Sequence, residues 1–397
     1  MTSSSKYFRF AGIFFLILVF PSCIKQFTPA LDKNDSQSSM VVEGMITDEI
    51  GPFKVHLTQS GPVDKLYTLV PYAGAKVLIS DDIGNSYQLF DNHNGWYETE
   101  DKTLKGIPGT TYTLKITDIE GNSFASTPEL MQDVPDIDSV YYKEVKKARF
   151  ENGLTYEDNW LNILLDTHDQ TGKTKYWLWK FEETWEIKML TTVRVKHGNP
   201  DINAAEIYYS TENVVIDPEK EVCWVSRPSS SVLLHSTVNA NVDSINKFVV
   251  QSLGPGGDKL HIRYSILVKQ YSLNKESYNY WKQLEKVNED ASGIYNTIPG
   301  PVYGNIQCKS GGKNALGYFL ASSVKTKRIF INRTDHHIAT VSPYDICTYL
   351  TDPDPHIYPY WIYFTNILNT DIKLWVIFDN YCVDCRAYGT NVKPDFW

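Results

Sequence analysis

The sequence predicts an all-β protein in which an N-terminal sandwich precedes a larger β-rich domain with one helical excursion. Strand-forming aromatic residues are abundant, with 26 Tyr, 17 Phe and 10 Trp, and such residues suit half-buried strands. Short runs of alternating apolar and polar residues recur between Gly, Asn and Pro turn signals at intervals of about 8 to 12 residues, which is typical of a sandwich. One window has the apolar period of an α-helix instead.

The first stretch of the chain has the pattern of a secretory signal peptide, which we assign to residues 1–22. Lys6 and Arg9 precede an unbroken apolar run at residues 10–20, which is too short to cross a bilayer core of about 30 Å. The stretch ends in Pro, Ser and Cys23. This ending resembles a bacterial lipoprotein signal, in which the cysteine thiol is lipidated and becomes the new N-terminus. The residues before Cys23 depart from the usual pattern, so an ordinary signal peptide with an incidental cysteine is the alternative.

Residues 23–38 have few large apolar side chains and no periodicity, which predicts a flexible tether without a fold of its own. No later apolar run approaches the length of about 18 residues that a membrane-spanning helix needs. The formal net charge is −9, and Lys and Arg are not clustered. Nucleic acid is therefore excluded as a partner, because phosphate binding needs concentrated cations.

Residues 39–133 are expected to form the sandwich. Residues 53–57 alternate between apolar and polar side chains, the period of a strand with one wet face. Turns that contain Gly or Asn separate this run from further strand candidates at residues 40–46, 75–79, 86–90, 96–98 and 112–116. This order predicts an immunoglobulin-like or transthyretin-like module.

Residues 134–397 are expected to form the larger β-rich domain. Pro135 favours an extended residue before it and marks the boundary. Residues 260–268 alternate over a long stretch, which predicts one long strand with a clear core face. Further strand candidates lie at residues 160–165, 175–181, 317–323, 327–332 and 373–378.

The helical excursion is predicted at residues 275–290. Asn274 is a favourable N-cap residue. Tyr278, Trp281, Leu284 and Val287 then recur at roughly helical spacing.

An ordered set of short motifs resembles a known family. The stretches VVEGMITDE, PYAGAKVLISDDIGNSYQLF, NGWYETE and GIPGTTYTLKI resemble the sandwich of carboxypeptidase regulatory-like domains. With VPDIDSVYY, CW, GYFLAS and the tail CVDCRAYGTNVKPDFW, they resemble the Bacteroidetes outer-membrane lipoprotein family of domain of unknown function 4249. No single motif is specific, but the ordered set is, and it runs from residue 23 to residue 397. The resemblance implies an accessory to a TonB-dependent receptor, a β-barrel importer, and it transfers no catalytic residues.

Five cysteines remain when Cys23 carries a lipid, so at least one thiol lies outside intramolecular disulfides, and spacing does not choose the connectivity. Cys382 and Cys385 form a CxxC motif, but no helical pattern follows to lower a thiol pKa, and no further zinc ligands stand nearby. In an exported protein we expect structural disulfides. The family resemblance implies Cys223 as a partner, because the landmarks contain it and the CxxC motif. The candidates are Cys223, Cys347, Cys382 and Cys385.

Two polar clusters are weak metal candidates. His336 and His337 are adjacent, and adjacent side chains on a strand point to opposite faces, so an exposed turn is favoured over chelation. Asp352, Asp354 and His356 offer carboxylates and an imidazole, but alternating prolines predict an extended surface loop. We predict no metal site and no cofactor.

Three acidic residues share a stretch with three tryptophans: Glu182, Glu183, Glu186, Trp177, Trp179 and Trp185. An exposed row of these rings would be a sugar platform, whereas a sandwich core with a polar face is the favoured interpretation. The chain has no GxSxG motif, no HExxH motif and no phosphate-binding glycine loop. We therefore expect no catalysis.

The sequence thus favours a lipid-anchored outer-membrane binding protein that partners a TonB-dependent receptor. The alternatives are a stand-alone surface glycan binder, a structural subunit of an envelope assembly machine, or a hydrolase with an unrecognised site. Trp and Tyr dominate interface hot spots. We therefore name as interface candidates Trp96, Tyr303, Tyr358, Tyr360 and Trp361.

Overall fold

The computed structural model describes residues 39–60, 70–189, 193–195, 214–216, 218–290, 301–312, 315–342, 349–351, 362–365, 374–378 and 384–397. The predicted signal peptide, the tether and Cys23 lie outside these residues. The same holds for residues 352–361, Cys347 and Cys382. Within the described ranges, no helix has the length and apolar character needed to cross a bilayer.

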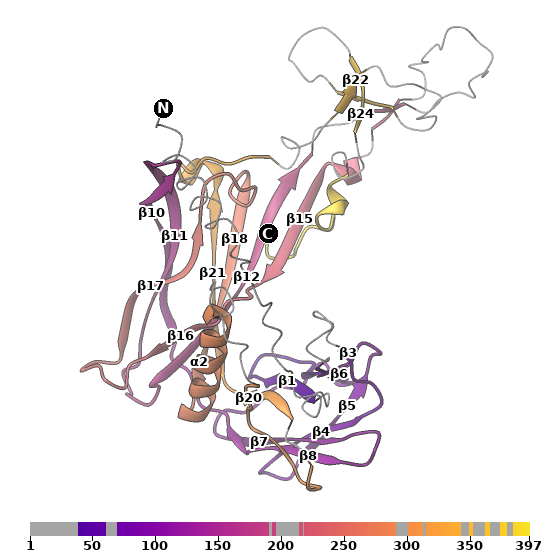
Figure 1. Cartoon of the computed structure of the whole chain (residues 1–397), viewed down its shortest axis with the longest axis vertical. Helices are drawn as coiled ribbons and strands as arrows, with labels where there is room; N and C mark the ends of the chain where they lie inside the picture. Colours follow the sequence, from indigo (N-terminus) through magenta and orange to yellow (C-terminus); the bar gives the residue numbers. More distant parts are fainter. Residues whose placement is uncertain are drawn as a thin grey trace, which may run out of the picture. The chain divides into compact units, whose positions relative to one another are not determined.

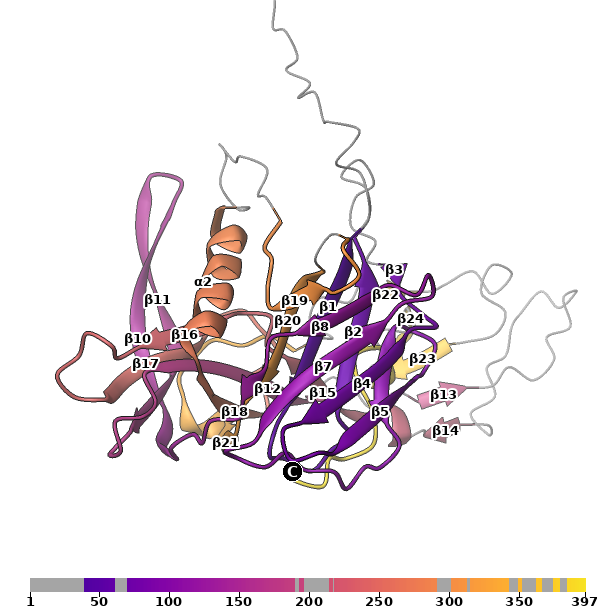
Figure 2. The same cartoon turned by 90° about the horizontal axis from the view of Figure 1, so that it is seen from below.

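The fold is all-β, as the sequence predicts, and its first sheet has eleven strands (Figures 1 and 2). They are β1 (Met40–Ile46), β2 (Lys54–Gln59), β3 (Val70–Pro71), β4 (Lys76–Asp81), β5 (Ser86–Asp91), β6 (Trp96–Thr99), β7 (Thr111–Thr117), β8 (Ser123–Ser126), β9 (Glu129–Leu130), β19 (Ile306–Cys308) and β20 (Leu316–Ala321). The main path runs β19-β8-β7-β4-β5-β6-β2-β1-β20. In β2, Val55 and Leu57 are fully buried, whereas Lys54 is exposed and His56 is half-buried. The alternation therefore gives the sheet one core face.

Two strands of this sheet come from the part of the chain after residue 134. β20 pairs parallel with β1, with Gly317 opposite Val42. Gly317 has a positive φ of 95°, and a Cβ there would lie 1.9 Å from the carbonyl oxygen of Val42. Glycine is therefore required where the two backbones meet.

Two further sheets share the largest core. One has the order β10-β11-β17, and the other has the order β15-β12-β18-β21 with β16 also paired to β12. The strands are β10 (Ile137–Glu151), β11 (Leu154–His168), β12 (Tyr176–Lys188), β15 (Val222–Pro228), β16 (Leu233–Ser236), β17 (Ser244–Leu253), β18 (Arg263–Leu273) and β21 (Val324–Asn332). In β18, Tyr264, Ile266 and Val268 are fully buried. They pack with Ile163 and Leu165 of β11 in one cluster, so both sheets contribute to the core.

Helix α2 (Lys275–Asp290) has the bounds that the sequence predicts. The side-chain oxygen of Asn274 accepts the backbone N–H of Ser277 at 2.7 Å, which caps the helix. Tyr278 and Trp281 pack, partly buried, against Leu178 of β12. The helix is therefore held by its aromatic face on one end of the β12–β18 sheet.

A further sheet of five strands has the order β14-β13-β23-β24-β22. Its strands come from two parts of the chain, one between β12 and β15 and one after β21. The strands are β13 (Val193–Val195), β14 (Val214–Ile216), β22 (Tyr349–Thr351), β23 (Ile362–Thr365) and β24 (Leu374–Phe378). β13 pairs antiparallel with β23, although these strands are far apart in the sequence.

Candidate functional site

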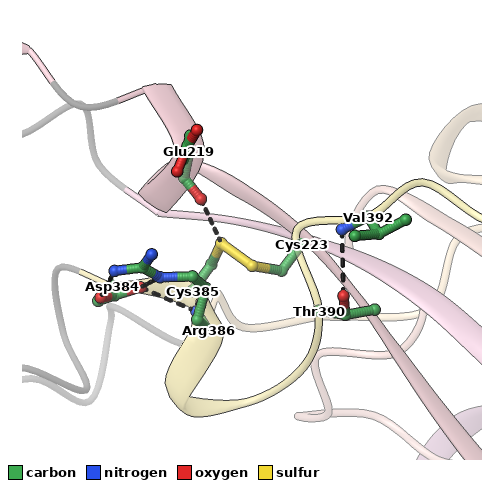
Figure 3. The surroundings of a disulfide bond; sticks show 7 residues. All are labelled: Glu219, Cys223, Asp384, Cys385, Arg386, Thr390 and Val392. Carbon is green, nitrogen blue, oxygen red and sulfur yellow. Dashed lines mark hydrogen bonds and ion pairs between the residues drawn. A yellow bond between two sulfur atoms is a disulfide. The ribbon is translucent and has the colours of Figure 1, made fainter.

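A disulfide holds the C-terminal segment to β15 (Figure 3). It joins Cys223 to Cys385 across a sequence separation of 162 residues, with 5.5 Å between their Cα atoms, and both cysteines are fully buried. Cys385 opens a short 3-10 helix (Cys385–Ala387). Asp384 caps this helix by accepting the backbone N–H of Arg386 at 3.1 Å. Its hydrogen bonds with the Arg386 guanidinium hold the pKa of the Asp384 carboxyl below its usual range.

The last residues continue from the disulfide across the β15-β12-β18-β21 sheet. Thr390 exchanges two backbone hydrogen bonds with Trp224, of 2.8 and 3.0 Å, which covers the edge of β15. A Cβ at Gly389 would lie 2.3 Å from the Trp224 carbonyl oxygen, so this approach needs glycine. The indole N–H of Trp397 donates to Glu186 of β12 at 3.3 Å. The Arg263 guanidinium of β18 lies 5.2 Å from the Trp397 ring.

The cysteine candidates are thus placed in part. Cys223 and Cys385 are two of the four candidates, and the sulfur of Cys385 is bonded to Cys223 rather than to its CxxC neighbour Cys382. Cys382 and Cys347 lie outside the described residues. Cys308 takes no part in this disulfide, and its sulfur accepts the backbone N–H of Gly312 at 3.3 Å.

The tryptophans that could have formed a sugar platform are buried. Trp177, Trp179 and Trp185 are 0%, 0% and 2% exposed and belong to the core, because they share the inward face of β12. The exposed row that a glycan binder would need is therefore absent at these residues.

Of the acidic residues beside these rings, Glu183 is buried and has partners for both of its carboxylate oxygens. Glu183 accepts hydrogen bonds from the Tyr264 hydroxyl at 2.6 Å and from Gln251 at 3.1 Å. Its other oxygen contacts the Lys259 ammonium group at 2.6 Å. Burial and the nearby carboxylate raise the pKa of Tyr264 well above its usual value. This arrangement satisfies each polar group locally.

The histidine pair is divided between two environments. His336 is buried, its Nε2 lies 3.2 Å from the carbonyl oxygen of Leu260, and burial lowers its pKa. The ring of His337 is exposed and its Nδ1 lies 3.1 Å from Glu144. Within the described ranges, no group of three or more His, Cys, Asp or Glu residues could hold a metal ion.

An aromatic patch, which we define as His56, Phe90 and Trp96, lies on the outer face of the first sheet. The rings of His56 and Trp96 stack with centroids 4.3 Å apart and planes 7° apart. Trp96 is 38% and Phe90 is 44% exposed. In the strand register, Glu98 of β6 lies between Phe90 of β5 and Lys54 of β2. Because Trp96 is two residues from Glu98 on β6, both point to the same face, and Phe90 therefore shares the face of Trp96.

Buried neighbours fix the orientation of Trp96. The next residue, Tyr97, points into the core with no exposure. Its hydroxyl donates to the Tyr72 carbonyl at 2.9 Å and accepts the Ala75 N–H at 3.1 Å. Because side chains alternate along a strand, this anchoring directs Trp96 outward. The sequence named Trp96 but missed His56 and Phe90, although Phe90 occupies a polar-face position of its strand.

Of the other interface candidates, Tyr303 is 52% exposed and forms an isolated bridge with Leu316. Tyr358, Tyr360 and Trp361 lie outside the described residues, as does the loop with Asp352, Asp354 and His356.

A projecting hairpin is a second surface feature that the sequence did not single out. The register pairs β10 with β11 from Ile137 to the turn at Asn152 and Gly153, whereas β17 pairs with β11 only from Leu161 onward. We define residues 146–159 as the arm. Near its turn, Phe150 is 75%, Leu154 59% and Tyr156 41% exposed.

These features define an all-β protein with a disulfide-held tail and two exposed surfaces of aromatic and apolar side chains. The sequence profile described as domain of unknown function (DUF4249) matches residues 24–328, more than half of the chain, and the chain belongs to this family. No curated protein matches it. The match covers the aromatic patch and the arm and ends before the tail at residues 384–397.

Proposed function

We propose that the chain is a lipid-anchored outer-membrane accessory protein that binds a partner protein, a TonB-dependent receptor. The observation that carries the binding role is the aromatic patch. Its Trp96 ring lies flat on His56 and is 38% exposed. Aromatic rings held in one orientation supply contact area at low entropic cost, and Trp is enriched in interface hot spots.

The anchor is supported by the first residues of the chain. A basic leader, an apolar run too short to span a bilayer and Cys23 stand before a polar stretch of 15 residues, 24–38. A lipid on Cys23 would hold the body close to other proteins of the same membrane. Such tethering raises the effective concentration of the patch at a partner without adding contacts.

The test is a purification of the full-length protein from its native envelope in gentle detergent, with a Cys23→Ala variant as control. We expect the wild type to fractionate with the outer membrane and to bring down one receptor barrel in stoichiometric amount. The control should leave the membrane fraction, because the thiol that carries the lipid is gone. Recovery of the wild type alone, or with assembly factors only, would contradict the receptor role.

A further inference from the structure

The arm is a two-stranded ribbon that extends past its sheet (Figure 2). Lys146 pairs with Asn159, and the ribbon continues to Glu151 opposite Leu154. An isolated two-stranded hairpin is marginally stable in water. This one nevertheless carries exposed apolar side chains at the end farthest from its sheet.

The exposed apolar side chains lie on both faces of the ribbon. Phe150 pairs with Thr155, whereas the next rungs pair Leu154 with Glu151 and Tyr156 with Arg149. Because neighbouring rungs point to opposite faces, Phe150 lies on one face and Leu154 and Tyr156 lie on the other. A groove in a protein buries one face of a ribbon. A lipid bilayer surrounds an inserted tip on both of its faces, which suits apolar side chains on both faces of the arm.

The cationic side chains of the arm have partners within it or at its base. Lys146 lies 3.2 Å from Glu157, and Arg149 pairs with Asp158 at 2.9 Å and with Glu151. Lys147 lies 4.3 Å from the Trp160 ring centroid and donates to Ser252 at 2.6 Å. Ion pairing lowers the cost of taking these side chains out of water. Lys147 beside the Trp160 ring and Arg149 beside the Tyr156 ring also suit the headgroup region of a bilayer.

The length of chain before β1 limits how far the body can stand from a lipid on Cys23. Fifteen residues, 24–38, would separate a lipidated Cys23 from Ser39. A flexible chain of this length spans roughly 19–23 Å on average. The arm from Lys146 to Glu151 extends about 17 Å at the strand rise of about 3.3 Å per residue. The two reaches are comparable.

We propose that the tip of the arm is a second membrane contact, with Phe150 and Leu154 among the acyl chains of the bilayer that holds the lipid of Cys23. This inference rests on the proposed lipid anchor. It assigns the arm to a lipid surface rather than to a protein groove.

The test places the photocrosslinker p-benzoylphenylalanine at position 150 and, separately, at position 154 of the full-length protein in its native envelope. Ile83 provides the matched control position, because it is 61% exposed in the turn between β4 and β5. After irradiation, we expect phospholipid-mass adducts on the peptides of both arm positions and none at position 83. The melting temperature should not change, because these side chains are mostly exposed.

The outcomes separate this inference from the proposed function. If the wild type fractionates with the outer membrane but the arm positions crosslink to protein, or to nothing, the anchor stands and the arm inference is overturned. A lipid adduct at only one of the two positions would also overturn it, because insertion surrounds both faces. If the wild type leaves the membrane fraction as Cys23→Ala does, the anchor fails and the inference fails with it.

Discussion

At the scale of single residues, Glu129 connects four parts of the structure. It is 2% exposed and accepts hydrogen bonds from Asn305 and Tyr318, each at 2.9 Å. It also accepts from Asn274, the N-cap of α2, at 2.9 Å and from Thr127 at 3.2 Å. Burial raises the pKa of this carboxyl above its ordinary value of 4.5, although the four hydrogen bonds act in the opposite direction.

This raised pKa gives a prediction with a definite sign. Below the unfolded pKa the carboxyl is neutral in both states, and its favourable contribution to the free energy of unfolding is complete. That contribution is lost as pH rises from 4.5 through the folded-state pKa. Glu129→Gln lacks this titration and turns an amide N–H₂ toward Asn274, which costs about 1–3 kcal/mol. We expect the wild-type melting temperature minus that of the variant to fall as pH rises above 4.5, and a series from about pH 4 to about pH 8 follows this decrease.

The measurement is thermal unfolding of both proteins across that range. Glu157→Gln, at a carboxylate on the surface of the arm, is the matched control and should change the melting temperature little. A melting-temperature difference between wild type and Glu129→Gln that stays constant with pH would contradict this prediction, because it would show that Glu129 does not ionise in this pH range.

Local residue patterns predicted the cap of α2 but not the role of Glu129. Asn274 stands directly before a helical period, so the sequence alone identifies it. The partners of Glu129 are separated from it by up to 189 residues. No local spacing indicates that they meet.

At the scale of elements, the disulfide and the tail form one unit. Removing the bond frees a loop of 162 residues, for which the loop-entropy model gives about 4–5 kcal/mol. We therefore expect Cys223→Ala combined with Cys385→Ala to lower the free energy of unfolding by about this amount in denaturant titrations. Cys308→Ala is the control and should have a small effect.

Peptide mapping without reductant checks the pairing itself. It should recover the Cys223 and Cys385 peptides joined. Recovery of Cys385 joined to Cys382 would contradict this arrangement, as would a double variant as stable as the wild type.

The sequence predicted individual strands and the helix correctly where a short run of residues has a regular apolar period. β18 and α2 have the alternation and helical spacing that the sequence shows. The Asn152-Gly153 pair is a local hairpin signal for the arm. Asn152 and Gly153 have positive φ angles of 52° and 79°, the conformation of the tight hairpin turn that Asn-Gly favours. The pairing of β20 with β1 joins residues about 275 positions apart. A local residue pattern cannot predict such a long-range pairing.

At the scale of the whole molecule, we propose separate roles for the anchor, the arm and the aromatic patch in a tethered binding protein. The lipid and the arm would hold the body at the membrane, and the patch would meet the partner. The fold class predicted from the sequence is confirmed, and Trp96, which the sequence named as an interface candidate, is exposed. The sequence could not indicate that Trp96 stacks on His56, because these residues come together only through the pairing of β2 with β6.

The most direct test of this account is a quantitative pull-down from the native envelope with a Phe90→Ala/Trp96→Ala variant. The matched control is Ile83→Ala, which removes an exposed apolar side chain from the turn between β4 and β5, outside the patch. Loss of the two patch rings should reduce receptor recovery at least about tenfold, since hot-spot truncations cost about 2 kcal/mol or more. The control should recover the receptor like the wild type, and both variants should remain in the outer membrane. Equal receptor recovery with the patch variant and the wild type would contradict the assignment of the patch as the partner-binding surface.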